Sequence, residues 1–237
     1  KIKELHLKIL AIIPARKGSK RLKNKNIMNL IGKPLIEYSI EHAKHSKLIT
    51  DICISSNCNQ IRKIASDHNI VFIKRPENLC TDKASSESAL VHALDQMESV
   101  DKNYDLVVFL QCPSPIRRRS DIDDAINKLI SSNADSLFSG FKNHNFYWRN
   151  QNGNFESVNY NFKSRKREQD FKPNINENGS IYIFKPNILR RENNRLGGKI
   201  VFHEMPEWAS FQIDDILDFE IVSSILKNKI FVNQISD

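Results

Sequence analysis

The chain has few of the features that mark disulfide-bonded, zinc-stabilised or membrane-spanning proteins. Its four cysteines (Cys53, Cys58, Cys80 and Cys112) form no CxxC pair, which disfavours a structural metal site. No stretch approaches the roughly 18 apolar residues of a membrane span, and residues 1–8 are too poor in apolar side chains for a signal peptide. We therefore expect a cytoplasmic protein that makes no membrane contact.

The chain does have enough length for a core and an excess of positive charge. At 237 residues it can bury a sizeable core without disulfides or metal, and we expect a single domain over residues 1–237. It has 36 Lys and Arg against 28 Asp and Glu, a net charge of +8. Such a field concentrates anions such as nucleotides, sugar acids or nucleic acid, and does not choose among them.

Strand and helix patterns alternate along the N-terminal half. Apolar runs predict strands at 7–14, 51–56, 70–73 and 106–111. Helical patterns occupy 34–45, 59–68, 85–98 and 120–131. Nearly continuous apolar runs are typical of parallel strands covered on both faces, so we predict an α/β fold with a mostly parallel sheet and helices on both faces.

The segment 142–173 differs from the rest of the chain. It is rich in Asn, aromatic residues and positive charge, and it has few helical periods. We predict an extended arm here that serves as a dimer contact. Around it, strands at 134–141, 180–184 and 199–205 and an amphipathic helix at 215–229 belong to the main body.

The loop after the first strand is the first candidate site. It reads PARKGSKRLKNKN from Pro14, so cations and small residues fill the space between Arg16 and Lys25. Ligands of open α/β sheets sit at the carboxyl ends of strands, and such a loop suits a triphosphate held by backbone amides and charged side chains. It is not the GxxxxGK[ST] phosphate loop. A solvated basic loop or a nucleic-acid patch is the alternative.

Five segments of the chain, in order, carry a resemblance to a known family. They are IIPARKGSKRLKNKNIMNLIGKPLIEYSI from Ile12, KRPENLCTDKASS from Lys74, VVFLQCPSPIR from Val107, EQDFKPNINENGSIYIF from Glu168 and FQIDDILDFE from Phe211. Together they closely resemble the acylneuraminate cytidylyltransferases, the CMP-sialic acid synthetase family. The related enzymes that activate the eight-carbon acid Kdo have a shorter loop before the lysine, and a CMP-Kdo-type synthetase stays as the alternative.

The resemblance implies a fold and a reaction. The fold would be a Rossmann-like α/β fold, assembled as a homodimer with Mg²⁺ as cofactor. The reaction would be attack of the anomeric hydroxyl of a sialic acid or related nine-carbon sugar acid on the α-phosphorus of CTP, with pyrophosphate leaving.

Matching positions imply a set of nucleotide-binding residues. They are Arg16, Lys25, Asn26, Arg75 and Ser86. Arg16 and Lys25 would bracket the triphosphate, while Arg75 and Ser86 match cytosine and ribose contacts. Ser86 lies at the start of a predicted helix, where it or Ser85 could simply cap the helix.

Three further matches imply sugar contacts: Gln111, Asn178 and Tyr182. The amide of Gln111 both donates and accepts, which suits orienting a hydroxyl or carboxylate. Alternatively, Gln111 is a strand-end residue bonded to backbone and Tyr182 an ordinary strand aromatic. The run 117–119, three arginines, is expected to supply surface charge.

Asp214 matches the family's magnesium ligand, and completes an implied catalytic set with Arg16, Lys25 and Gln111. Mg²⁺ prefers one or two carboxylates plus phosphate oxygens and water. Many family members carry a second aspartate two residues earlier, where this chain has Gln212. Either Asp214 suffices, or Asp215 or Asp218 contributes, or Asp214 and Asp215 only cap the last helix.

Two further features bear on the acceptor. Some sialic-acid-specific members have two phenylalanines near the stretch RLGGKIVF, where this chain has Leu196 and Gly197. We therefore hypothesise a related nonulosonic acid, such as legionaminic acid or a deaminated analogue, as acceptor. The arm cations, at 163 and 165–167, resemble residues that reach the neighbouring subunit's sugar carboxylate, although a solvated charge run is an equal alternative. A non-catalytic polyanion-binding relative, or an inactive one signalled by Gln212, remains the rival interpretation.

Overall fold

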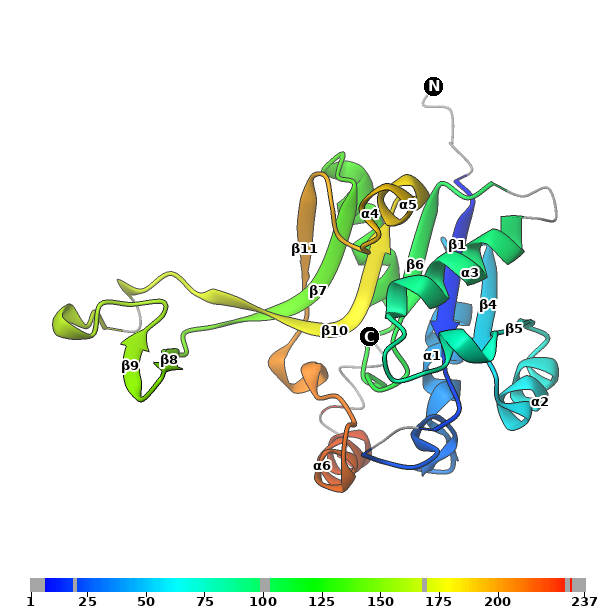
Figure 1. Ribbon diagram of the computed structural model, residues 1–237, viewed down its shortest axis with the longest axis horizontal. Coiled ribbons are helices and arrows are strands. Elements are labelled where there is room, and N and C mark those ends of the chain that lie inside the picture. Colours follow the sequence, from blue (N-terminus) through cyan, green and yellow to red (C-terminus); the bar gives the residue numbers. More distant parts are fainter. Residues whose placement is uncertain (1–6, 19–20, 99–102, 168–169, 229–230, 232–237) are drawn as a thin grey trace.

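The computed structural model describes residues 7–18, 21–98, 103–167, 170–228 and 231. Ser19, Lys20, Glu168 and Lys229, which belong to segments considered above, lie outside these residues. The strands of the main sheet are β1 (Ile9–Pro14), β4 (Asp51–Ser56), β5 (Val71–Lys74), β6 (Leu106–Leu110), β7 (Ser136–Asn143), β10 (Asn174–Phe184) and β11 (Ile200–Glu204). Within the described ranges these seven form one sheet in the order β11-β7-β10-β6-β1-β4-β5 (Figure 1).

The sheet is parallel apart from β10. Strand β1 pairs in parallel with β4 and β6, β4 with β5, and β11 with β7. Strand β10 runs antiparallel between β6 and β7. The carboxyl ends of the parallel strands therefore meet at one edge of the sheet, where β10 begins. The central apolar strands β1 and β6 are buried as predicted, whereas β5 at the sheet edge has only one buried residue, Ile73.

Helices cover both faces of the sheet, as predicted. They are α1 (Leu35–His45), α2 (Asn59–Asp67), α3 (Ser86–Glu98), α4 (Asp121–Ser131), α5 (Pro186–Glu192) and α6 (Ile216–Lys227). One core cluster joins the sheet to α1, α2, α4 and α6, and the other joins it to α3 and α5. The predicted apolar face of α3 (Leu90, Ala93, Leu94 and Met97) is buried in the second cluster.

A short hairpin separates the basic loop from α1. Strands β2 (Asn29–Leu30) and β3 (Lys33–Pro34) pair across Ile31 and Gly32, both of which have positive φ. Helix α1 begins at Leu35, one residue after the predicted start, because Pro34 has the extended ψ of 139°. In the described part of the chain, no helix combines the length and apolar character needed to cross a membrane.

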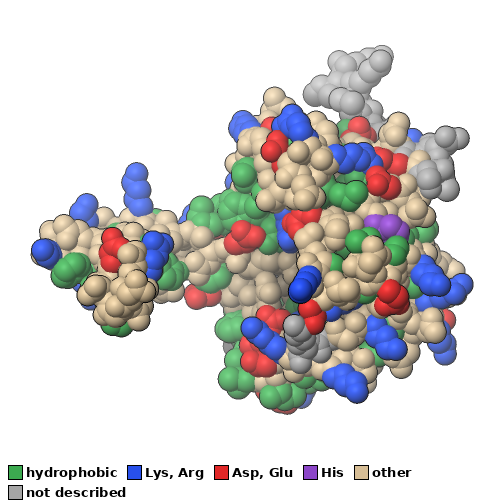
Figure 2. Space-filling model, viewed as in Figure 1, with side chains coloured by type: hydrophobic (Ala, Val, Ile, Leu, Met, Phe, Trp, Pro, Cys, Tyr) green, Lys and Arg blue, Asp and Glu red, His purple; other side chains and the backbone are tan. Residues whose placement is uncertain are grey.

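The arm, residues 142–173, extends away from the body (Figure 1). Strands β7 and β10 reach past the body, and between them lies a hairpin of β8 (Trp148–Gln151) and β9 (Asn154–Ser157). Figure 2 shows hydrophobic side chains gathered at the base of the arm and Lys and Arg side chains along it. The rings of Phe146 and Tyr160 pack with centroids 4.3 Å apart, so the arm has a small aromatic core of its own.

Two elements differ from the sequence-based expectation. Strand β10 begins at Asn174 instead of residue 180, because its polar first half pairs with the outer end of β7. Helix α5, which follows β10, was not predicted. It has only seven residues, too few to show a helical period.

Candidate active site

A cavity of ≈530 Å³ opens at the carboxyl edge of the sheet. The chain runs from β1 to β4 and β5 on one side, then returns to β6 on the other side of β1. Such a reversal of strand order leaves a crevice between the loops that follow the two central strands. Seven of the nine predicted site residues line this cavity: Arg16, Lys25, Asn26, Arg75, Ser86, Gln111 and Asp214.

Lys25 and Asp214 form an ion pair inside the cavity. The Nζ atom of Lys25 lies 2.8 Å from Oδ1 of Asp214, although 189 positions separate them in sequence. The Lys25 side chain is 10% exposed and that of Asp214 is 48% exposed. Lys25 starts a 3-10 turn (Lys25–Ile27) that follows the positive-φ residue Asn24, and this turn directs the lysine inward. The cavity therefore contains a nearly buried cation beside an accessible carboxylate.

Asp215 and Asp218, which follow Asp214, cap helix α6. The carboxylate of Asp215 accepts from the backbone amides of Leu217 and Asp218, and that of Asp218 accepts from the amides of Asp214 and Asp215. This is a capping box at the start of α6. Asp215 is thus the cap, and the side chain of Asp214 points to Lys25 instead of capping the helix.

Arg16 ties the basic loop to the loop after β5. Its guanidinium donates to the carbonyl of Cys80 at 3.1 Å and to Oδ1 of Asp82 at 2.8 Å. The side-chain amide of Asn26 donates to the Arg16 carbonyl at 3.2 Å. Asp82 was missed in the sequence, although it lies within the family-like segment TDKASS; it lines the cavity together with Thr81.

Arg75 places a second buried cation at the cavity. It is 5% exposed, and its guanidinium donates to Oγ and to the carbonyl of Ser55 at 3.1 and 2.6 Å. Burial lowers the pKa of its guanidinium below the usual 12.5. A buried cation is poorly screened by water, so Arg75 attracts an anion in the cavity more strongly than an exposed arginine would.

The first turn of α3 also faces the cavity, which both Ser85 and Ser86 line. The hydroxyl of Ser85 accepts from the amide of Ser88 at 3.1 Å, so Ser85 takes the capping role that the sequence left open between the two. Amides in the first turn of a helix favour anions.

Gln111, which follows β6, lines the cavity together with Phe109 of that strand. Side chains alternate along a strand, so Phe109 lies on the same face as Gln111, and it also lines the cavity. The sequence contained this signal in the spacing of two, but Phe109 was not predicted. Its ring stacks on that of Tyr182, with centroids 5.5 Å apart.

Asn178 and Tyr182 lie beside the cavity instead of lining it. Asn178 is 3% exposed, and its Oδ1 accepts from Oγ of Ser139 at 2.6 Å. Tyr182 is 4% exposed and donates to Glu177. Burial, followed by the hydrogen bond with Glu177, raises the pKa of Tyr182. Both side chains are occupied within the fold, and their sugar-binding role stays a prediction.

Gln212 belongs to this neighbouring region. Its side-chain amide donates to the backbone carbonyl of Asn178. Gly179 has a φ of +62°, and a Cβ placed there would press on the amide of Gln212 and lie 3.4 Å from Nε2 of Gln111. The glycine therefore allows the two glutamine side chains to approach the β10 backbone at the point where its register shifts, between Glu177 and Tyr182.

The prediction that Arg117 supplies surface charge is wrong. Its side chain has no exposed surface, and burial lowers the pKa of its guanidinium to about 10. The run of three arginines reads as a solvated patch because the sequence does not reveal that the Arg117 side chain donates to Ser39 of α1 and to the carbonyls of Gln111 and Ser180. Of its neighbours, Arg118 pairs with the buried Asp121 at 2.7 Å.

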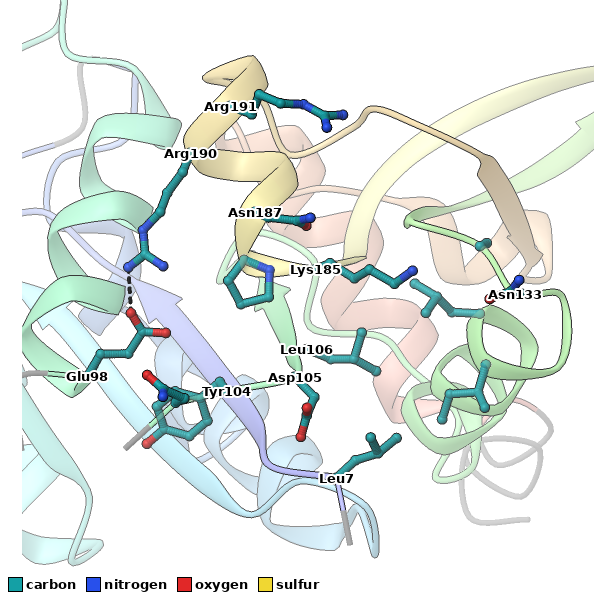
Figure 3. Close-up of a pocket in the computed structure, with 15 residues that line it drawn as sticks. Leu7, Glu98, Tyr104, Asp105, Leu106, Asn133, Lys185, Asn187, Arg190 and Arg191 are labelled. Atoms are coloured by element: carbon teal, nitrogen blue, oxygen red, sulfur yellow. Dashed lines mark hydrogen bonds and ion pairs between the residues drawn. The ribbon is translucent and has the colours of Figure 1, made fainter. Parts of the chain in front are cut away.

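A larger cavity, of ≈900 Å³, lies at the opposite edge of the sheet. Figure 3 shows Leu7 and Leu106 facing it, with Arg190 of α5 directed to Glu98 at the end of α3. That pair is 2.5 Å apart, and Arg190 also pairs with Asp95 at 2.7 Å. None of the nine predicted site residues lines this cavity.

Comparison with known proteins gives a consistent result. The family model described as cytidylyltransferase matches residues 10–234. The chain is 31% identical to the N-acylneuraminate cytidylyltransferase of Escherichia coli O18:K1:H7 over 95% of its own length and 54% of that protein. It thus spans about half of this relative. It is 33% identical to the pseudaminic acid cytidylyltransferase of Campylobacter jejuni, over 93% of this chain and 97% of that one.

Among solved structures, the fold resembles a CMP:2-keto-3-deoxy-manno-octonic acid synthetase complexed with CTP. The TM-score is 0.68 at 15% identity, covering 92% of this chain and 98% of the other. At that identity the likeness shows the fold alone. The family model covers nearly the whole chain, with the strand-edge cavity inside the matched region, and on that ground the chain belongs to the cytidylyltransferase family.

Proposed function

We propose that the chain transfers CMP from CTP to the anomeric hydroxyl of a nine-carbon 2-keto sugar acid, with pyrophosphate as leaving group. The observation that carries the proposal is the convergence of seven predicted residues, from four of the five family-like segments, on the cavity at the strand edge. Cations that converge at a topological switch point suit a triphosphate.

The nucleotide end would lie along the basic loop. Arg16, Arg21, Lys25 and Arg75 supply four cations around one cavity, and the first turn of α3 adds backbone donors. Phosphoryl transfer depends mostly on alignment and on neutralising the phosphate charge. Lys25 would move from Asp214 to a phosphate oxygen when the nucleotide enters, because both anions compete for one ammonium group.

Asp214 is the carboxylate that fits a magnesium ion. It is half-exposed in the cavity, whereas Asp215 and Asp218 are committed to the capping box and Gln212 donates to backbone. Mg²⁺ bound by one carboxylate takes its other ligands from phosphate and water. The ion would supply additional neutralisation of phosphate charge.

The acceptor would approach Gln111 and the Phe109 wall. Arg195, beside Leu196, places its guanidinium 5.1 Å from the ring centroid of Phe109 and 4.8 Å from that of Tyr182, and pairs with Glu87 at 2.8 Å. This polar surround favours an acid with hydrogen-bonding substituents. The relatives include both a pseudaminic acid and an N-acylneuraminate cytidylyltransferase at similar identity, so the preference for a related nonulosonic acid rests on Leu196 and Gly197, where some sialic-acid-specific members have two phenylalanines.

Pyrophosphate release tests the proposal. Each of the four nucleoside triphosphates is supplied with Mg²⁺ and with N-acetylneuraminic, legionaminic or pseudaminic acid, or Kdo. We expect release only with CTP, and the fastest rate with legionaminic or pseudaminic acid. Preference for N-acetylneuraminate would overturn the acceptor assignment, and preference for Kdo would favour the eight-carbon alternative. No release with any pair would overturn the catalytic proposal.

We also propose that the arm joins two copies of this chain in a homodimer. Trp148, Phe155 and Phe162 are 46%, 68% and 51% exposed, a concentration of apolar surface that suits a partner. Replacing Trp148 and Phe162 by Ser should convert a dimer of 27.4 kDa chains to monomer in analytical ultracentrifugation. The control Val71→Ser removes an equally exposed side chain (51%) from the body and should leave the dimer intact. A dimer in the double variant would contradict the proposal.

A further inference from the structure

We infer that Arg117 is a positioning residue for Gln111, the proposed acceptor contact. This inference rests on the proposed function. Arg117 itself touches no part of the strand-edge cavity, because it does not line that cavity and its side chain has no exposed surface. Its influence on the reaction therefore has to pass through the backbone that it binds.

The guanidinium joins the end of β6 to the middle of the neighbouring strand β10. Its Nη2 atom donates to the carbonyl of Gln111 at 3.0 Å and to that of Ser180 at 3.0 Å. These carbonyls lie where the β6–β10 ladder ends: the pair Leu110 and Ile181 is in register, and the next bond, from the Gln111 amide to the Ser180 carbonyl, is stretched to 3.5 Å. The arginine thus supplies the connection where the strand ladder weakens.

Helix α1 fixes the arginine from below. The Nη1 atom donates to Oγ of Ser39 at 3.3 Å, and the carbonyl of Arg117 lies 3.1 Å from Nε2 of His42. Ser39 is fully buried. A planar guanidinium with several donors in fixed directions can hold three acceptors at once, which the single ammonium of lysine does less well.

Stability alone does not account for this arrangement. Burying a charge costs several kcal/mol, and well-packed apolar replacements of buried ion pairs are often neutral or stabilising. Within the described part of the chain, Nε of Arg117 and Oγ of Ser180 are buried without a hydrogen-bond partner. This buried region around Arg117 is therefore polar, and two of its hydrogen-bonding atoms have no partner among the described residues. It lies next to Gln111, whose side-chain amide is proposed to contact the acceptor. Such imperfect sites are typical of functional positions.

The hydrogen bonds from Arg117 to the carbonyls of Gln111 and Ser180 also limit how Gln111 can move. Gly179, the residue before Ser180 in β10, allows the amides of Gln111 and Gln212 to lie close to the β10 backbone. With both backbone carbonyls held by one guanidinium, Gln111 keeps a fixed distance from this part of β10. Near-attack geometry is sensitive to misplacement of about 1 Å, which can cost on the order of 10²-fold in rate.

Three variants test the inference: Arg117→Lys, Gln111→Ala and their combination. The acceptor is whichever acid of the panel above reacts fastest, and CTP affinity is measured separately by calorimetry with Mg²⁺. We expect Arg117→Lys to lower kcat/KM for the acceptor by about 10- to 100-fold and to change CTP affinity by less than about twofold. In the Gln111→Ala background the same substitution should have almost no further effect, because nothing remains to be positioned.

Two controls keep the outcomes separate. Arg118→Lys makes the same substitution one residue away and should leave the acceptor kinetics unchanged. Ser39→Ala removes one acceptor of the guanidinium without burying a new charge, so it serves if Arg117→Lys does not fold. It should lower kcat/KM by about two- to fivefold, and only when Gln111 is present.

The inference would be overturned if the double variant lost kcat/KM by the product of the Arg117→Lys and Gln111→Ala losses. It would also be overturned if Arg117→Lys lowered CTP affinity as much as kcat/KM for the acceptor. A Ser39→Ala loss of the same size in both backgrounds would overturn it too. Failure of the wild-type protein to transfer CMP to any acid of the panel is a different result, because it counts against the proposed function.

Discussion

The two cavities at opposite edges of the sheet differ in what converges on them. The larger one, at the opposite edge, is lined by Leu7, Leu106 and Leu129 and by five charged residues: Glu98, Asp105, Lys185, Arg190 and Arg191. Its three cations pair with carboxylates of the surrounding helices and loops, Lys185 with Asp135, Arg190 with Glu98 and Asp95, and Arg191 with Glu192. The smaller one collects four cations (Arg16, Arg21, Lys25 and Arg75), two carboxylates (Asp82 and Asp214) and a helix N-terminus from loops at the carboxyl edge of the sheet. Convergent charge at the carboxyl edge, more than cavity size, therefore identifies the candidate site.

The largest effect is expected at the Lys25–Asp214 ion pair of the smaller cavity. Lys25→Ala and Asp214→Ala should each lower the rate of pyrophosphate release by about 10²- to 10³-fold, as loss of one positioned charge does in other active sites. The control Lys23→Ala removes an exposed lysine of the same loop and should change the rate by less than about threefold. Rates near wild type in both site variants would remove the basis of the assignment.

A smaller effect is expected at Gly179 of β10, beside the cavity. In Gly179→Ala the new Cβ presses on the Gln212 amide, and the φ of +62° becomes strained. We expect roughly a tenfold loss of kcat/KM for the acceptor and little change in CTP affinity, since the new Cβ would meet Gln212 and Gln111, the proposed acceptor contact. The matched change Gly153→Ala, at an arm turn with a φ of +91° and open space, should leave the kinetics of the chain unaltered.

A buried charge that lies in neither cavity should affect stability and leave catalysis nearly unchanged. Asp121 has no exposed surface and accepts hydrogen bonds from Arg118 and His203. Burial raises its pKa, but the hydrogen bonds from His203 and Arg118 outweigh burial and hold it below the usual 3.8. The ionised form therefore stabilises the fold above about pH 4, and this contribution is lost as the pH falls through the lowered pKa.

Asp121→Asn should thus lower the free energy of unfolding at pH 7 by about 3 kcal/mol. The gap between variant and wild type should narrow below about pH 4, as chemical denaturation at several pH values would record. A gap that stays constant from pH 7 to pH 3 would show that the carboxylate charge is not what stabilises this corner.

The smallest effect is expected at the larger cavity. Ile130 lines it and is 44% exposed, so Ile130→Trp can partly fill the space without disturbing the core. Pyrophosphate release should stay within about twofold of wild type, because no step of the proposed reaction uses this edge of the sheet. A loss of tenfold or more would mean that the two edges are not independent.

Much of the fold follows from local patterns. The apolar run 106–111 predicted a buried strand, and the four apolar positions of α3 predicted its buried face. The polar stretch from Asn174 to Gly179 did not predict a strand, because its pairing with β7 is a long-range interaction that supplies the order. Arg117 was missed for the same reason: its acceptors Ser39 and Ser180 are 78 and 63 residues away in the chain.

The site was predictable in part. The resemblance to the family predicted that both Lys25 and Asp214 belong to the site. Their direct contact could not be predicted, because it joins residues 189 positions apart and depends on where α6 packs. Asn178 and Tyr182 were placed in the same group, but β10 shifts register between Glu177 and Tyr182. That irregularity changes which side chains reach the cavity, and simple alternation along a strand does not reveal it.

A crystal structure of the protein with CTP and Mg²⁺ tests the account most directly. We predict the triphosphate in the strand-edge cavity, with a phosphate oxygen about 2.7–2.9 Å from the Nζ atom of Lys25 and the Lys25–Asp214 pair separated. Density for the nucleotide in the cavity beside Leu106 and Arg190, or an undisturbed Lys25–Asp214 pair in the complex, would contradict it.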